Sequence, residues 1–295
     1  MFDFLDVRAL ALSAAGGLVV LLAAALGPAA LAGDGPTLGE GGRIPASRAE
    51  LTGVNFIEVC RFSHRLPDDP IVAFGRPGAS HDHSFVGSRS TSASSIFPTL
   101  RAAGTTCERP SDTAAYWVPT LFQGTTAIPP VAATIYYRRV TVAPIRSFRP
   151  NLRMIAGNAT ADRPQGMAIT WWSCGAASGT KPSTAIPTCP NVRGSWLRLH
   201  VRFPACWNGR QLDSADHKSH MAYPVRGACP STHPVSVPQL TQIYRYQSRG
   251  GGTDFYLASG GQYSAHADFV NAWRQPVLRM LVEACLDALV HCGRG

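Results

Sequence analysis

The chain has 295 residues, of which 45% are hydrophobic and only 15% are charged, which excludes an intrinsically disordered protein and is enough for a substantial buried core. Its formal charge of +9 comes almost entirely from arginines that are scattered along the sequence. This distribution argues against nucleic-acid binding and indicates a basic surface compatible with anionic cell-wall polymers.

The N-terminal segment has the features of an export signal. Residues 9–32 are almost unbroken apolar, and Ala30-Leu31-Ala32 matches the small-x-small pattern of a cleavage site. The run is also long enough to cross a bilayer, so residues 1–32 are expected to be a signal peptide or a membrane anchor. Residues 33–50, rich in glycine and proline, are expected to form a flexible tether. We therefore expect an exported protein, extracellular or on the cell surface, that contacts a membrane only through an uncleaved N-terminal segment.

The eight cysteines point to an oxidising compartment. All of them follow the apolar run, and their number is even. No CxxC pair is present, which makes a structural zinc knuckle a poor interpretation. We expect four disulfides and no free thiol, although many connectivities are possible. Joining each cysteine to its nearest neighbour gives Cys60–Cys107, Cys174–Cys189, Cys206–Cys229 and Cys285–Cys292.

Residues 51–295 are expected to form a single globular, β-rich domain of the α+β class, with antiparallel sheets and long loops. Short β-branched or aromatic runs bounded by Gly, Pro or Ser predict strands at 54–60, 71–74, 131–138, 167–174, 196–203 and 240–246. The run at 196–203 alternates in polarity, with Arg198, His200 and Arg202 on one face. His200 is therefore interpreted as a residue of a strand face rather than as a ligand.

The C-terminal part of the domain has a helical pattern. Apolar residues recur at three- and four-residue steps over 267–290, which predicts a helix kinked or split at Pro276. Asp268 would then be an acid in the first turn, stabilised by the helix dipole, if it is not part of a functional site. Upstream, Asp68-Asp69-Pro70 is interpreted as a turn.

Two dense polar clusters are the best candidates for chemistry. In Ser80-His81-Asp82-His83, both histidines would lie on one face if the segment is a strand. In the segment 213–220, a helical turn would place Asp213 below His217 and would make His217 and His220 neighbours. Imidazole beside carboxylate is suited to proton transfer or to binding a divalent metal ion. Because each cluster is too polar to be buried alone, we expect the two to share one site.

The candidate residues follow from these clusters. The catalytic candidates are His81, His83, Asp213, His217 and His220, and the four histidines among them are also the candidate ligands of a metal ion that the sequence does not identify. Residues near polar motifs are candidates for substrate binding, namely Trp117, Trp207, His233, His266 and Asp268. The HExxH, EF-hand and GxSxG motifs are absent from the sequence.

Several segments, taken in order, resemble one known family of proteins. They are Phe62-Ser63-His64, Asp69-Pro70-Ile71-Val72, Gly78 to His83, Thr105-Thr106-Cys107, Tyr116-Trp117-Val118-Pro119, Phe203 to Trp207, Leu212 to Pro224, Cys229 to Pro234 and His266-Ala267-Asp268-Phe269. The sequence is similar in these segments to domain-of-unknown-function family nineteen-ninety-six, of secreted actinobacterial and fungal proteins. The resemblance implies an extracellular setting. Some fungal members also carry carbohydrate-binding modules, which points to a polysaccharide partner, but the family has no established activity.

Three functional hypotheses remain open from the sequence. The leading one is an exported protein that acts on cell-wall or environmental polysaccharide through a His/Asp cleft, by acid–base or metal-assisted hydrolysis. The alternative is a non-catalytic carbohydrate- or metal-binding module of the cell surface. A third is purely structural: buried His/Asp networks that fix the loops between disulfides.

Overall fold

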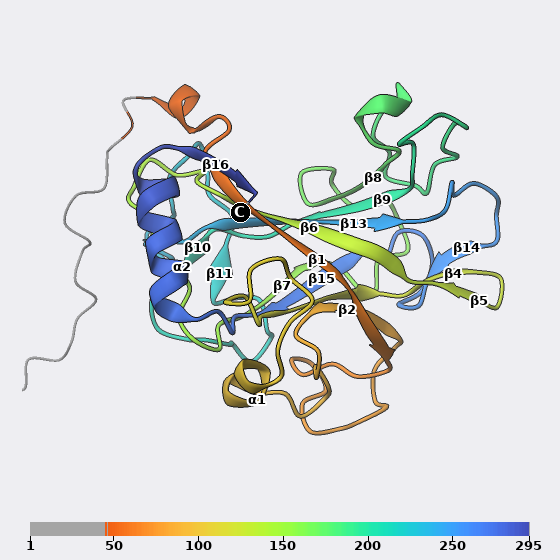
Figure 1. The fold of residues 1–295 in the computed structure, drawn as a ribbon, viewed down its shortest axis with the longest axis horizontal. Coiled ribbons are helices and arrows are strands. Elements are labelled where there is room, and N and C mark those ends of the chain that lie inside the picture. The colour runs from red at the N-terminus through yellow and green to blue at the C-terminus, as the bar shows by residue number, and fades with distance from the viewer. Residues whose placement is uncertain (1–44, 46, 295) are drawn as a thin grey trace, which may run out of the picture. The chain divides into compact units, whose positions relative to one another are not determined.

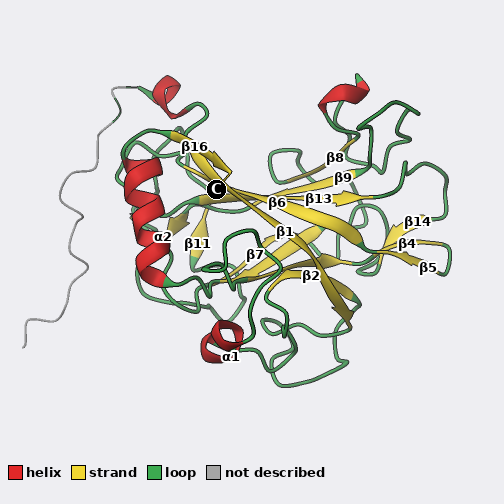
Figure 2. Ribbon diagram, in the orientation of Figure 1, coloured by secondary structure: helices red, strands yellow, loops and turns green. Residues whose placement is uncertain are grey.

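A computed structural model describes residue 45 and residues 47–294. The expected signal peptide or anchor at 1–32 and most of the expected tether lie outside the described residues. Within the described part of the chain, no helix is long and apolar enough to span a membrane. The expected fold class is confirmed: the described residues form mostly antiparallel β-sheets, stapled by four disulfides, with a C-terminal helix (Figures 1 and 2).

A ten-stranded sheet organises these residues in the order β7-β15-β3-β2-β1-β6-β13-β9-β8, with β16 added beside β1. The strand β1 (Asn55–Leu66) joins its two halves, because its first part pairs with β6 (Pro130–Arg138) and its last part with β2 (His83–Gly87). Only the pairing of β16 with β1 is parallel. The other strands are β3 (Ala115–Pro119), β7 (Arg153–Gly157), β8 (Thr170–Ser173), β9 (Arg198–Arg202), β13 (Gln239–Tyr246), β15 (His266–Val270) and β16 (His291–Arg294).

Two three-stranded sheets and a few short helices complete the architecture. The first small sheet contains β10 (Cys206–Trp207), β11 (Met221–Ala222) and β12 (Val235–Ser236). The second contains β4 (Leu121–Gln123), β5 (Thr126–Ile128) and β14 (Phe255–Leu257). The helices are the α-helices α1 (Phe97–Ala102) and α2 (Gln275–Leu281), the 3-10 helices η1 (Arg48–Leu51) and η2 (Ala176–Ser178), and the π-helical turn η3 (Val282–Asp287).

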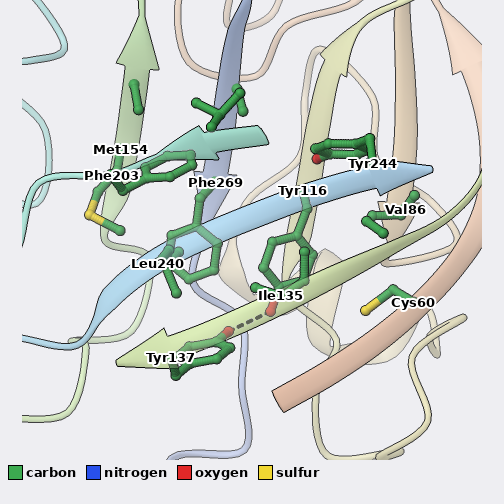
Figure 3. Close-up of a cluster of buried hydrophobic side chains, with 14 of the residues drawn as sticks. Cys60, Val86, Tyr116, Ile135, Tyr137, Met154, Phe203, Leu240, Tyr244 and Phe269 are labelled. Carbon is green, nitrogen blue, oxygen red and sulfur yellow. Dashed lines mark hydrogen bonds between the residues drawn. The ribbon is translucent and has the colours of Figure 1, made fainter. Parts of the chain in front are cut away.

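The hydrophobic core lies where the large sheet curls over itself. Tyr116 of β3 and Tyr137 of β6 are separated by two strands in the sheet, yet their hydroxyl groups are hydrogen-bonded to each other (Figure 3). Around them pack Ile135, Leu240 and Phe269, all fully buried. The Tyr116 hydroxyl also donates to the Asp112 carboxylate, and the Tyr137 hydroxyl accepts from the Trp273 indole, so the polar atoms at this depth are satisfied by a small network. The inward side chains of both halves of the sheet therefore share one core.

All four predicted disulfides are confirmed, with the predicted pairing. The shortest loop is closed by Cys285 and Cys292, seven positions apart. The chain turns back after η3 at Leu289, whose φ of 60° is left-handed, and then continues as β16 beside β1. Joining each cysteine to the next one along the chain predicted the pairing correctly, because every bridge closes a loop between consecutive cysteines.

Most of the predicted strands are confirmed, but two predictions are wrong. The segment 71–74 is a turn rather than a strand, because the Asp69 carboxylate accepts hydrogen bonds from the backbone N–H groups of Ile71 and Val72. The C-terminal helix begins at Gln275 rather than at 267, because residues 266–270 form the buried strand β15. Pro276 lies in the first turn of α2, where its missing N–H has no helical partner to lose. The interpretation of Asp268 as a helix N-terminal acid is therefore also wrong.

Candidate functional site

The candidate site is built on one face of three adjacent strands, β15, β3 and β2. Side chains alternate between the two faces of a strand. Phe269 and Tyr116 point into the main core, so their neighbours point to the opposite face. On that face His83, Trp117 and Asp268 are fully or almost fully buried. The pairing of Asp268 with Trp117 and of Trp117 with Phe85 brings β15 and β2 to either side of the indole.

Three histidines meet at one end of this face. His83 is paired with Pro119 of β3, and His266 lies at the same level on the other side of β3, so the two imidazoles approach each other with ring centroids 5.7 Å apart. His81, just before β2, has its ring centroid 4.2 Å from that of His83 and 5.0 Å from that of His266. His81 lies outside the strand, but its ring lies beside that of His83. The third histidine, His266, is 185 positions after His81 in the sequence.

The hydrogen bonds fix which nitrogens face the centre. His83 Nδ1 lies 2.9 Å from the Asp68 carbonyl oxygen, and His266 Nδ1 lies 3.0 Å from the Ser264 carbonyl oxygen. A carbonyl only accepts, so each Nδ1 carries the proton and each Nε2 carries a lone pair. His266 Nε2 is 3.2 Å from His81 Nε2. His83 Nε2 is buried without a hydrogen-bond partner among the described residues.

Two carboxyl groups complete the cluster. Asp268 Oδ2 is 3.8 Å from His266 Nε2, and neither carboxyl oxygen of Asp268 has a hydrogen-bond partner in the part of the chain that the structure describes. Asp69 lies in the turn that covers this face. Ligand atoms of His81, His83 and His266 lie within 4.8 Å of one another, and so do those of Asp69, His83 and Asp268.

Burial determines the charge state of the cluster. It lowers the pKa of His81, lowers that of His83 well below the usual value, and lowers that of His266 to about 3. Burial also raises the pKa of Asp268 well above its usual value, and the nearby Asp69 adds to this effect. The imidazoles are therefore neutral near pH 7, which is the form that binds metal ions. The Asp268 carboxyl has no hydrogen-bond donor among the described residues, and burial without a donor is unfavourable for the ionised form of a carboxyl group.

This donor set fits a divalent first-row metal ion such as Zn²⁺. Imidazole nitrogens with one or two carboxylates are ordinary ligands of such ions. The bonds from Nδ1 to backbone carbonyls are the supporting contacts that orient metal-binding histidines. The ion would supply the positive partner that His83 Nε2 and the Asp268 oxygens lack. His81, His83, His266, Asp268 and Asp69 are the residues that could hold it.

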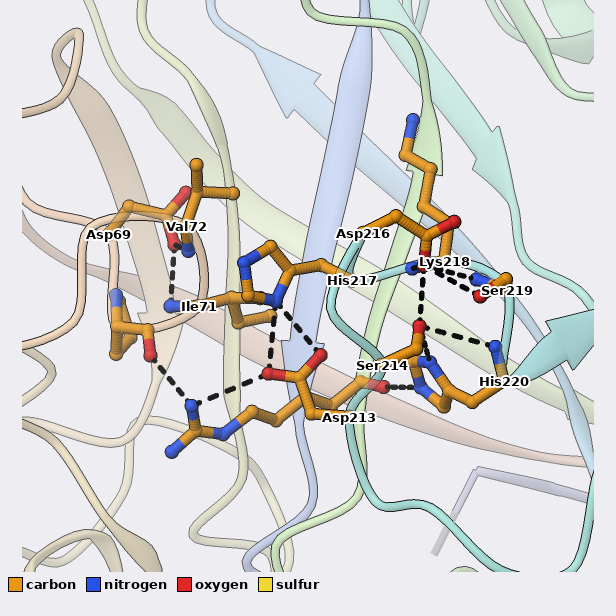
Figure 4. A network of polar contacts seen from close by, with 12 residues as sticks. Asp69, Ile71, Val72, Asp213, Ser214, Asp216, His217, Lys218, Ser219 and His220 are labelled. Atoms are coloured by element: carbon orange, nitrogen blue, oxygen red, sulfur yellow. Dashed lines mark hydrogen bonds and ion pairs between the residues drawn. The ribbon is translucent and has the colours of Figure 1, made fainter.

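The second sequence cluster forms a separate polar network (Figure 4). Its backbone is a series of turns rather than the helical turn that the sequence suggested. The predicted contact nevertheless exists, because His217 Nδ1 is 2.9 Å from Asp213 Oδ1. Asp216 accepts hydrogen bonds from Ser214 and from Ser219, which lowers the pKa of its carboxyl. The network thus stabilises a turn. Asp213 contacts only Nδ1 of His217 and not Nε2.

The two clusters adjoin through Asp69 and Lys218. Burial raises the pKa of the Asp69 carboxyl, and Figure 4 shows the His217 ring between the Asp69 turn and Asp213. Lys218 donates to the Gly157 carbonyl, 2.8 Å away, beside β15. Its charge lowers the pKa values of both His266 and Asp268.

The remaining candidate residues lie in positions that are less favourable for binding a metal ion or a sugar. Both ring nitrogens of His220 are hydrogen-bonded, Nδ1 to Ser214 and Nε2 to the Arg153 carbonyl. Trp117 is fully buried and the Trp207 indole donates to the Gln211 carbonyl, so neither offers an exposed ring to a sugar. His233 Nε2 bonds the Ser219 carbonyl at the edge of the second network.

Asp69 was interpreted from the sequence as a turn residue and was not among the predicted site residues. Its position before Pro70 signalled a turn, and the turn is present. The available signal for a functional role was the acid pair Asp68-Asp69 only a dozen residues before His81. Asp68 fixes the same loop, since its carboxylate accepts from the Gly78 and Ala93 N–H groups and its carbonyl orients His83.

Comparison with known proteins identifies one family. The model of the family described as "Domain of unknown function (DUF1996)" matches residues 69–273. The matched region starts at Asp69 and includes His81, His83, His266 and Asp268. No curated protein and no solved structure shows a significant match.

Proposed function

Because the chain belongs to the DUF1996 family, and its buried cluster lies wholly within the matched region, we propose a function for that cluster. The protein is an exported metal-dependent hydrolase: it binds one divalent ion through His81, His83, His266 and Asp268 and cleaves a cell-wall or environmental polysaccharide.

The observation that carries the proposal is the convergence of ligand atoms, some of which are buried without a hydrogen-bond partner. The Nδ1 atoms of His83 and His266 are occupied by backbone carbonyls, so their Nε2 atoms face the centre. His83 Nε2 has no hydrogen-bond partner among the described residues, and His266 Nε2 faces His81 Nε2 at 3.2 Å. Both oxygens of Asp268 are buried without a hydrogen-bond partner among the residues described. A purely structural network would satisfy these atoms internally, because leaving a buried polar group unpaired typically costs about 1–3 kcal/mol.

Access to the ion supports a catalytic rather than a closed structural centre. His83, His266 and Asp268 are almost fully buried, whereas His81 is only partly buried. Solvent and substrate therefore approach from the side of His81. Such an ion would act as a Lewis acid that activates water and polarises the oxygen of the bond to be cleaved.

His217 is the proposed proton carrier. Its Nδ1 is engaged by Asp213, in the way that a carboxylate orients a catalytic imidazole, and its Nε2 is left to take a proton from the attacking water. The water oxygen bonds to the anomeric carbon as the glycosidic C–O bond breaks. The departing sugar oxygen then receives the proton from His217, so the reaction consumes one water and needs no other reactant.

Export supports a polysaccharide as the substrate. Four disulfides are typical of proteins outside the cytoplasm, where polysaccharides are the abundant polymers. The basic composition of the chain would favour anionic members of this class.

The test begins with metal content. Mature protein purified without a metal-affinity tag should bind about one equivalent of Zn²⁺, measured by plasma mass spectrometry after dialysis. His83→Ala and His266→Ala should lose it. The matched control is His64→Ala, because His64 also lies in the large sheet but bonds the Thr91 carbonyl. Full metal content in His83→Ala, or no metal binding by the wild type, would contradict the proposal.

The second step measures product release. The wild type with Zn²⁺ should release reducing ends from cell-wall polysaccharide, chelation should stop the release, and added Zn²⁺ should restore it. A protein that binds Zn²⁺ but releases no product would be the non-catalytic metal-binding module, the alternative that the deep burial of three of the four ligands favours.

A further inference from the structure

The outer face of the large sheet carries a group of arginines that the metal centre does not use. The strands β1, β6, β13, β9 and β8 lie side by side in this order (Figure 1). Their inward side chains form the core, and the alternate positions face outward. The outward positions include Arg138 of β6, Arg198 and Arg202 of β9, and Arg245 of β13, which together we call the arginine face.

The register brings these guanidinium groups close together. Arg245 of β13 lies directly opposite Arg198 of β9. In the second outward row beyond this pair, Thr241 lies between Arg202 and Tyr136. Directly opposed residues on antiparallel strands have Cα atoms about 4.5–5.5 Å apart. A groove of about 230 Å³ runs over this region, and its lining includes Arg198, Arg245 and Arg294.

Carboxylates are missing from this face. The only acid on the five strands is Glu58, which points inward and pairs with Arg109. Within the described part of the chain, none of the four arginines of the arginine face forms an ion pair, whereas Arg294 at its margin is paired with Glu108. Like charges in this arrangement repel one another, and an anionic ligand would relieve the repulsion.

Aromatic rings orient two of the four arginines. The guanidinium of Arg202 lies over Trp171, 5.0 Å from the ring centroid, and that of Arg138 lies over Tyr136 at 4.4 Å. His200 stacks on Trp171 with a centroid distance of 4.7 Å. Contacts between a cation and an aromatic face favour one orientation of the guanidinium. Because these rings are engaged by protein side chains, they are poor platforms for stacking nucleic-acid bases, which single-strand binders provide.

We propose that the arginine face binds the carboxylate groups of an acidic polysaccharide. Planar guanidinium groups on neighbouring strands form paired hydrogen bonds with carboxylates, and a row of them matches a polymer that repeats its charge. The proposal rests on the proposed function for its ligand class, a polysaccharide, and it adds that this polymer carries uronic-acid carboxylates.

Binding to polygalacturonate, neutral dextran, dextran sulfate and double-stranded DNA tests the proposal, with the mature protein in each case. The wild type should bind polygalacturonate best, bind dextran negligibly, and lose affinity as salt rises, because salt screens exposed charges. The double variant Arg198→Gln/Arg245→Gln should bind polygalacturonate about tenfold more weakly, since two charge-assisted contacts are lost. Its Zn²⁺ content and melting temperature should stay at wild-type values.

The matched control is Arg210→Gln/Arg279→Gln, which removes the same charge from exposed arginines in a loop and on α2. It should retain wild-type affinity. Equal loss in both double variants would mean that net charge alone governs binding, and this would overturn the proposal. So would preferential binding of DNA or of dextran sulfate, which carries sulfates but no carboxylates, or no binding of any polymer. A failed metal test with intact polygalacturonate binding would overturn only the proposed hydrolase.

Discussion

At Asp268 the protein keeps a carboxyl group in an environment that disfavours it. The side chain is almost fully buried on β15, and burial raises its pKa well above the usual value. Neither of its oxygens is hydrogen-bonded within the described residues. Functional groups are commonly retained at such a cost in stability, because the ligand supplies the missing interaction.

This leads to a prediction about the variant Asp268→Val, in which the new valine is an apolar, β-branched residue suited to a buried strand. In the presence of a chelator, the variant should be more stable than the wild type by about 1–3 kcal/mol, because an unpaired polar group is removed. With saturating Zn²⁺ the order should reverse, because only the wild type gains binding energy. Thermal melts of both proteins in both conditions measure this. A metal-free variant that melts well below the wild type would show that the carboxyl is structural.

His217 and His220 are close in sequence but differ in their surroundings. His217 has a left-handed backbone with φ of 58°, is partly exposed, and uses only Nδ1 in its contact with Asp213. His220 is buried and bonded at both nitrogens. A non-glycine residue in the left-handed region is strained, and such strain is concentrated at functional sites.

We therefore predict opposite effects for the two alanine variants. His217→Ala should reduce polysaccharide turnover by about 100-fold or more, as expected for the loss of a general acid–base group, with little change in melting temperature. His220→Ala should lower the stability by about 1–3 kcal/mol, because buried partners are left unpaired. Product-release assays and thermal melts on the two variants separate these effects. Full turnover in His217→Ala would remove this residue from the mechanism.

At the scale of elements, the sequence predicted one half of the large sheet and missed the other. Strands β1, β6, β8, β9 and β13 each have one outward face, so their polarity alternates or their β-branched residues stand out. Strands β2, β3 and β15 are buried at every position. A strand buried on both faces has no polarity pattern, and the apolar spacing of β15 even merges with that of α2 into one false helix.

The candidate site could be predicted only in part, because it lies on the strands that the sequence did not predict. The pair His81 and His83 could be predicted from spacing, since alternate residues share a face. Their meeting with His266 depends on the order β15-β3-β2, which is a long-range property that no local pattern contains. The contact of His217 with Asp213 was predicted for a helical turn and is made by an irregular turn, because four-residue spacing brings side chains together in both.

At the scale of the whole molecule, the disulfides anchor the loops, and the two halves of the large sheet carry different groups of polar residues. Each bridge closes a local loop, so the long loops that cover the histidines are anchored without a larger core. One half of the sheet carries the buried candidate metal ligands, and the other half carries the arginine face. We infer that binding of the polymer and cleavage of the polymer are assigned to different strands.

The position of a bound metal ion tests most directly whether the three histidines and Asp268 hold one. Crystals of the mature protein grown with Zn²⁺ should be measured on both sides of the zinc absorption edge. The predicted anomalous peak lies about 2.0–2.2 Å from the Nε2 atoms of His81, His83 and His266, with Asp268 as the carboxylate ligand. A peak between His217 and His220, or no ordered zinc at the three histidines, would contradict the account.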